Sequence, residues 1–174
     1  MRQVTSFLLA LVLPCAFFNA SAQDVVLTGH VQKITLLPFG ADDCTSPCAP
    51  DGTGRVCIYN SPGCQIMEVN VDKVLLGEAG PVRIFRSHIG EWGPSFSITR
   101  QPIVVSEDGG NVSWSRATLR DEKIYIDSSQ LRSIRGVKAS DVSPDDNGMV
   151  ALDALLDRVR QADARQQRRS IGKE

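Results

Sequence analysis

The chain has 174 residues and an almost balanced charge, because 19 lysines and arginines stand against 20 aspartates and glutamates. Hydrophobic residues make up 42% of it and aromatic residues 6%. A protein that binds nucleic acid usually carries a clear basic excess, often with aromatic side chains for base stacking. This composition excludes neither a globular core nor a protein partner, but it leads us to predict no nucleic-acid partner.

The first residues, MRQVTSFLLALVLPCAFFNASAQ, are typical of a secretory signal peptide. Arg2 precedes an uncharged run from Phe7 to Phe18, and Ala20–Ser21–Ala22 supplies the small residues of a cleavage site. The run is shorter than the roughly 20 apolar residues that span a bilayer, and Pro14 interrupts it. We therefore predict that residues 1–22 are removed, that the mature chain is periplasmic or extracellular, and that no transmembrane anchor remains.

Four cysteines follow the predicted signal peptide: Cys44, Cys48, Cys57 and Cys64. In an oxidising compartment an even number of cysteines predicts disulfides, here two. The spacing C-x3-C-x8-C-x6-C lacks the C-x2-C pairs of common zinc sites, so we predict no metal and no other cofactor. Three pairings are possible, and the turn-rich segment between Cys57 and Cys64 favours a bridge between those two.

Alternating apolar and polar residues predict about six or seven strands before residue 130. A break in the alternation near Gln32–Lys33 indicates a β-bulge in the first strand, and a second break follows Val71. Residues 107–111, EDGGN, predict a tight hairpin turn. Asn111–Val112–Ser113 also fits the acceptor pattern for N-glycosylation. The predicted strands are Val25–Leu37, Gln65–Leu76, Val82–Phe85, Ile103–Val105, Val112–Ser115 and Lys123–Ile126.

The C-terminal segment changes to a helical period. Its apolar residues recur at the spacing of one helix face: Met149, Leu152, Leu155, Leu156 and Val159. Ser143–Pro144 predicts the N-cap and first residue of that helix. Beyond Arg160 the apolar stripe ends and arginines accumulate, which indicates either a basic arm for an acidic partner or a solvated, frayed helix end.

The segment from Val69 to Gly77, VNVDKVLLG, followed by a turn and Val82–Arg83–Ile84, resembles the netrin-like superfamily, which includes the tissue inhibitors of metalloproteinases. There a V-x-x-V-L-x-G strand belongs to a small five-stranded OB-type barrel, and the resemblance implies such a barrel over residues 25–126. The chain departs from the family at its expected mature N-terminus, which would be Gln23–Asp24 rather than cysteine. Inhibition through an N-terminal cysteine is therefore not carried over.

These observations predict a mainly β protein: a small OB-like, netrin-like barrel of five to seven strands with a C-terminal α-helix. The mature length of about 150 residues suits a single domain. We expect three regions, namely a signal peptide (residues 1–22), a disulfide-containing β-barrel domain (23–136) and a C-terminal helix with a basic tail (137–174).

Two segments stand out as binding loops: the cysteine loop (residues 38–54) and the His88 loop (residues 88–96). In the His88 loop, His88 and Glu91 form an H-x-x-E pair, which on a helix could ligate a metal. The glycines and proline around the pair make a helix unfavourable there. We expect Trp92 and Phe96 to anchor the loop against the core and His88 and Glu91 to stand at a binding rim.

The functional expectation is an exported, non-enzymatic protein-binding module, inhibitor-like or immunity-like, whose partner is another exported or envelope protein. Loops on a rigid scaffold commonly carry this kind of function. Two alternatives stay open. One is a small exported hydrolase, possibly metal-dependent, that uses His88 and Glu91, although the sequence contains no G-x-S-x-G motif. The other is a structural envelope component held by the C-terminal helix.

Overall fold

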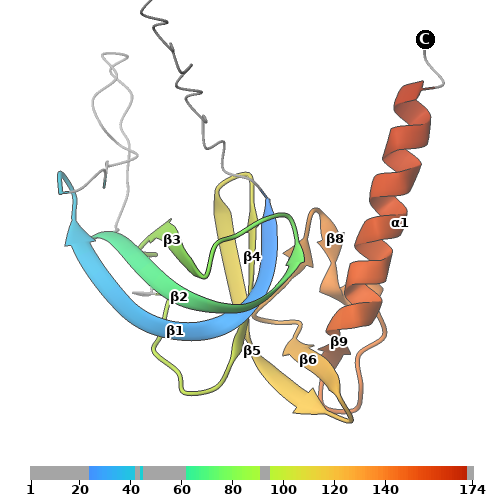
Figure 1. Cartoon of the computed structure of the whole chain (residues 1–174), viewed down its shortest axis with the longest axis horizontal. Coiled ribbons are helices and arrows are strands. Elements are labelled where there is room, and N and C mark those ends of the chain that lie inside the picture. The colour runs from blue at the N-terminus through green and yellow to red at the C-terminus, as the bar shows by residue number, and fades with distance from the viewer. Residues whose placement is uncertain (1–23, 42–43, 45–61, 91–94, 172–174) are drawn as a thin grey trace, which may run out of the picture.

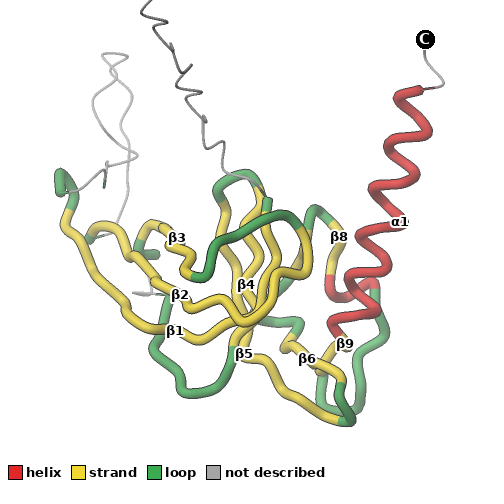
Figure 2. The backbone as a smooth tube through the Cα atoms, in the orientation of Figure 1, coloured by secondary structure: helices red, strands yellow, loops and turns green. Residues whose placement is uncertain are grey.

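The computed structural model describes residues 24–41, 44, 62–90 and 95–171. These residues form a mainly β fold with a C-terminal helix, which confirms the predicted class (Figures 1 and 2). The elements are β1 (Val25–Pro38), β2 (Gly63–Leu76), β3 (Val82–His88), β4 (Ile103–Asp108), β5 (Asn111–Arg120), β6 (Lys123–Asp127), β7 (Ser133–Ile134), β8 (Val137–Lys138), the 3-10 helix η1 (Ala139–Asp141), β9 (Met149–Ala151) and α1 (Leu152–Ile171).

Seven of these strands form one antiparallel sheet in the order β3-β2-β1-β4-β5-β6-β9, and β7 pairs with β8 in a separate hairpin. Among the described strands, β3 and β9 are the sheet edges, so the strands pair in an open order and do not close into a ring. The predicted strand number is confirmed, whereas the closed OB-like barrel is corrected to a curled, open sheet. An ion pair of 2.6 Å between Arg83 of β3 and Glu107 of β4 spans the curl.

The two long strands β1 and β2 bend because extra residues interrupt their ladder. On β1, the register shifts between Val31 and Lys33, so Gln32 has no partner opposite it. On β2, a shift opposite Thr28 and Gly29 leaves Asp72 as the extra residue. Both bulges confirm the breaks predicted from the sequence. Bulges increase strand twist and bending, and Figure 1 shows β1 and β2 as strongly curved ribbons.

Two hydrophobic clusters lie on opposite faces of the central strands. On β1 and β4, alternate side chains point to opposite sides, so these strands are buried on both faces. The cluster within the curl contains Val25, Leu27, Val31, Met67, Val69, Phe85, Phe96, Ile103 and Val105. The cluster beneath α1 contains Val26, Val104, Ala117, Ile126, Leu131, Ile134, Ala139, Val150, Leu152, Leu155, Leu156 and Val159.

The C-terminal helix begins later than the sequence predicts. Ser143–Pro144 does not cap it, because α1 starts at Leu152 and the preceding residues Met149–Ala151 form β9. Strand β9 pairs with β6, with Met149 opposite Asp127. Met149 therefore belongs to the sheet, although its spacing also fits the helical stripe.

Asp145 organises the turn that delays the helix. Its Oδ1 accepts hydrogen bonds of 2.9 Å from the backbone N–H groups of Asn147 and Met149. Its other carboxylate oxygen lies 2.5 Å from the Arg120 guanidinium, which also lies over the Tyr125 ring at 4.0 Å. The Arg120 hydrogen bond, and then the backbone hydrogen bonds, hold the pKa of Asp145 below its ordinary value. This network stabilises a turn at Asp145, where the sequence predicts the first turn of the helix.

The first half of α1 packs against the sheet. The side chains that it buries are Leu152, Leu155, Leu156 and Val159, which confirms the apolar stripe. Farther along, the turn of the β7–β8 hairpin supports the helix through an ion pair of 3.2 Å between Arg135 and Asp163. The boundary expected between residues 136 and 137 falls in this hairpin turn, and the cluster beneath α1 contains residues from both sides of it.

Candidate functional site

The ends of β1, β2 and β3 meet at one end of the sheet. In the ladder, Pro38 lies opposite Gly63, and Cys64 lies opposite His88. Gly63 has a φ of +153°, and a Cβ on it would lie 2.0 Å from a carbonyl oxygen of β1, so this approach requires glycine. The roots of the cysteine loop and the His88 loop are thereby placed side by side.

A disulfide joins Cys44 of the cysteine loop to Cys64 of β2, with a Cα–Cα distance of 5.7 Å. The bridge between Cys57 and Cys64 that the turn-rich segment favoured is therefore wrong, because Cys64 pairs with Cys44. Cys48 and Cys57 lie outside the described residues. The bond fixes one point of the cysteine loop to the strand that faces His88, and it is compatible with an exported protein.

A buried glutamine holds both ends of the His88 loop. Gln65 of β2 has no exposed surface. Its Nε2 donates to Ser95 Oγ at 2.7 Å and to the His88 carbonyl at 3.3 Å, and its Oε1 accepts from the Phe96 N–H at 2.9 Å. A single side chain thus binds the start and the end of the loop, and its own burial is compensated by these bonds.

Further contacts fasten the same loop to the sheet. The Ile89 N–H donates to the Gly63 carbonyl at 2.9 Å, and Trp114 Nε1 donates to the Ser95 carbonyl at 3.1 Å. Phe96 is 4% exposed and belongs to the cluster within the curl, which confirms its predicted anchoring role. Trp92, the other expected anchor, lies outside the described residues.

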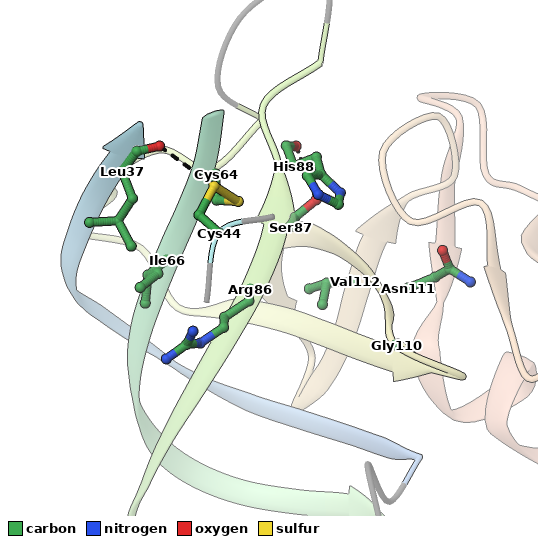
Figure 3. A pocket seen from close by; sticks show the side chains of 10 residues that line it. All are labelled: Leu37, Cys44, Cys64, Ile66, Arg86, Ser87, His88, Gly110, Asn111 and Val112. Atoms are coloured by element: carbon green, nitrogen blue, oxygen red, sulfur yellow. Dashed lines mark hydrogen bonds between the residues drawn. A yellow bond between two sulfur atoms is a disulfide. The ribbon is translucent and has the colours of Figure 1, made fainter. Parts of the chain in front are cut away.

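A pocket of about 340 Å³ lies at this end of the sheet (Figure 3). Strands β1, β2 and β3, the β4–β5 turn and the start of β5 contribute to it, together with the disulfide. Its lining mixes aliphatic side chains with polar ones: Leu37, Cys44, Cys64, Ile66, Arg86, Ser87, His88, Gly110, Asn111 and Val112. This volume is at the lower end of the range for ligand pockets.

The structure places His88 on this rim but does not test the H-x-x-E pair, because Glu91 lies outside the described residues. His88 is exposed at the end of β3, and its ring centroid lies 6.4 Å from that of Phe39 at the root of the cysteine loop. The adjacent Ser87 hydroxyl donates to the His88 backbone carbonyl at 3.3 Å.

The other histidine of the chain lies away from the pocket. His30 Nδ1 is 2.9 Å from a carboxylate oxygen of Asp72, and both side chains are 47% exposed. Neither residue lines the pocket beside His88. Across the described ranges, no group of three or more His, Cys, Asp and Glu side chains could hold a metal ion. Within the same residues, no helix has the length and apolar character to cross a membrane.

Several residues of the site were not predicted from the sequence, among them Gln65, Arg86 and Asn111. Gln65 could have been noticed, because it shares the buried parity of Met67 and Val69 and is the polar residue in that series. Arg86 and Asn111 could not have been recognised as neighbours from the sequence, because only the curl of the sheet brings β3 close to the β4–β5 turn. In that turn Gly109 and Gly110 have φ values of +54° and +82°, which confirms the predicted tight hairpin.

Comparison of the chain with known protein families, with curated proteins and with solved structures gives no match. The fold and the site define only a general class of protein. It is a disulfide-containing protein with a curled β-sheet, a pocket at one end of the sheet where the roots of two loops meet, and a C-terminal helix packed on the outer face of the sheet. The resemblance to the netrin-like superfamily stays a prediction from the sequence.

Proposed function

We propose that this protein is an exported, non-enzymatic binding module that recognises another exported or envelope protein at the pocket rim. The rim is the set of residues that line the pocket beside the roots of the cysteine loop and the His88 loop. The observation that carries the proposal is the convergence of both loop roots on one pocket. They are fixed there by the Cys44–Cys64 disulfide and by the buried Gln65.

The chemistry of the rim favours recognition of a protein side chain. Leu37, Ile66 and Val112 offer apolar surface for an inserted side chain, whereas Arg86 and Asn111 offer hydrogen-bond donors beside it. Interfaces often combine an apolar anchor with such polar neighbours. The rigid attachment of the loop roots also reduces the conformational entropy that binding would cost.

Export of the protein fits the signal-peptide pattern and the disulfide. An inhibitor-like or immunity-like role is the specific form of the proposal, since such proteins bind exported enzymes through loops on a stable scaffold. A netrin-like relationship would be consistent with that role, although the cysteine-dependent chemistry of metalloproteinase inhibitors has no counterpart at the predicted N-terminus, Gln23–Asp24.

A matched pair of substitutions on β5 tests the proposal. Asn111→Arg places a long side chain on the pocket rim, whereas Leu119→Arg introduces the same residue at the far end of the strand, where Leu119 is 70% exposed. The immobilised mature protein and both variants are incubated with envelope and secreted fractions of the producing organism. Bound proteins are then quantified by mass spectrometry.

We expect at least one protein to be recovered equally by the unmodified chain and Leu119→Arg and to be lost with Asn111→Arg. Circular dichroism checks that both variants keep the fold. If every recovered protein binds both variants equally, or if none is recovered, the pocket rim is not the binding surface.

A further inference from the structure

The second half of α1 extends beyond the core. Between Leu152 and Ser170, Val159 is the last buried residue, and the side chains from Arg160 to Ser170 are exposed except for the partly buried Asp163. The helix nevertheless continues to Ile171. Figure 1 shows this half of α1 projecting past the strands.

Arginines line one face of the projecting helix. At about 100° per residue, Arg158, Arg165 and Arg169 lie within an arc of about 40°, and Arg168 lies beside them. From Arg158 to Arg169 the helix rises about 16 Å. We call these four residues the arginine face. No acidic residue and no large apolar side chain of the described helix lies within the arc that these four arginines occupy.

The arginine face differs from four other arginines of this fold, because those four make ion pairs. Arg83, Arg120, Arg135 and Arg160 each pair with a carboxylate. Within the described part of the chain, neither a salt bridge nor a hydrogen bond engages the side chains of the arginine face. Their guanidinium groups therefore retain their full donor capacity for a ligand.

A groove of about 150 Å³ runs beside this face, between α1 and the β7–β8 hairpin. Val137 and Ala162 give it small apolar surface, and Arg158, Gln161 and Arg165 border it, together with Asp141. Charge is also unevenly distributed. Residues 158–171 contain five arginines and one aspartate, a net charge of +4, although the mature chain has 18 basic against 20 acidic residues.

We propose that the arginine face and its groove bind an extended, acidic segment of a protein. Guanidinium groups bind carboxylates in a bidentate manner, and the spacing of Arg158, Arg165 and Arg169 along about 16 Å suits several carboxylates in sequence. The groove accepts a small apolar side chain between them. This surface is separate from the pocket rim, so it adds a second contact to the proposed function and does not depend on it.

A membrane surface fits the arginine face less well than an acidic segment. Helices that lie in the lipid interface place large apolar residues such as Trp, Phe or Leu opposite their basic face. On the projecting half of α1 most of the remaining face consists of short or polar residues, among them Ala164, Gln167 and Ser170. Single-stranded nucleic acid would require aromatic side chains for stacking, and residues 158–171 contain none.

The test uses the mature chain and a fluorescein-labelled peptide that repeats Glu-Glu-Val four times, with binding followed by fluorescence anisotropy at moderate and high salt. The double variant Arg165→Gln/Arg169→Gln removes two guanidinium groups from the arginine face. The matched control Arg160→Gln removes one from the opposite face. We expect the double variant to weaken binding about tenfold or more and the control to leave it within about twofold.

Two further measurements complete the test. Arg165→Lys/Arg169→Lys keeps the charge but loses the bidentate geometry, so we expect intermediate affinity. Vesicles of phosphatidylglycerol and phosphatidylcholine test the lipid alternative by cosedimentation. The proposal is overturned if the unmodified chain does not bind the peptide, if Arg160→Gln weakens binding as much as the double variant, or if vesicles bind and the peptide does not.

Discussion

Replacement of Gln65 by methionine removes the side chain that holds both ends of the His88 loop. Methionine is unbranched and similar in length, so it fills the space of the glutamine without leaving a large cavity. It cannot replace the hydrogen bonds to Ser95 Oγ, the His88 carbonyl and the Phe96 N–H. The substitution therefore isolates the contribution of the polar contacts.

The cost follows from burial. Each hydrogen bond contributes about 1 kcal/mol net, and a buried N–H left without an acceptor costs about 1–3 kcal/mol. Phe96 is 4% exposed, so its N–H has little access to water. The sum is about 2–4 kcal/mol, because the long bond to the His88 carbonyl adds little. For a domain of this size, that loss lowers the melting temperature by about 5–15 °C.

Differential scanning calorimetry measures the change, with Gln32→Met as the matched control, since Gln32 is exposed at the β1 bulge. Hydrogen exchange followed by mass spectrometry locates it, and we expect faster exchange at Phe96 in the Gln65→Met protein alone. If Gln65→Met melts within about 1 °C of the control and exchange at Phe96 is unchanged, Gln65 does not hold the loop.

Two other predictions concern the disulfide and the turn before α1. Replacement of both Cys44 and Cys64 by serine removes a cross-link between positions 20 residues apart and should cost about 3 kcal/mol, measured by urea denaturation; an unchanged midpoint would contradict the bond. Because the pKa of Asp145 is lowered in the folded state, its contribution to stability is fully present above the unfolded value of about 3.9 and is lost as pH falls below it. The difference in melting temperature between the unmodified chain and Asp145→Asn should therefore be largest above about pH 5 and shrink below about pH 4; a difference that grows on acidification would contradict this sign.

The strands could be predicted because their residues alternate with a period of two wherever one face is buried. Even the bulge at Gln32 is visible as a break in that alternation. The same periodicity misplaced Met149, since its spacing fits a helix, whereas the Asp145 turn and pairing with β6 place it in a strand. The spacing of neighbouring residues does not show which distant strand a segment pairs with.

The candidate site was predicted only in part, for a related reason. Disulfide pairing depends on which strands lie side by side, and the sequence could not show that Cys64 faces the root of the cysteine loop. His88 was singled out by its residue type, and Phe96 by its apolar character. Asn111 lies at the same pocket as His88 only because the sheet is curled. The arginines of the C-terminal segment are visible in the sequence, but only the fold shows that those of the arginine face make no ion pair or hydrogen bond with other described residues.

Site-specific photo-crosslinking in the producing organism tests the central claim, that the pocket rim binds another exported protein. A photoreactive phenylalanine analogue replaces Asn111 on the rim or, as a control, Leu119 at the exposed far end of β5. We expect a discrete adduct of the mature protein with one exported protein from position 111 and none from position 119. Absence of an adduct from position 111, or the same adduct from both positions, would contradict it.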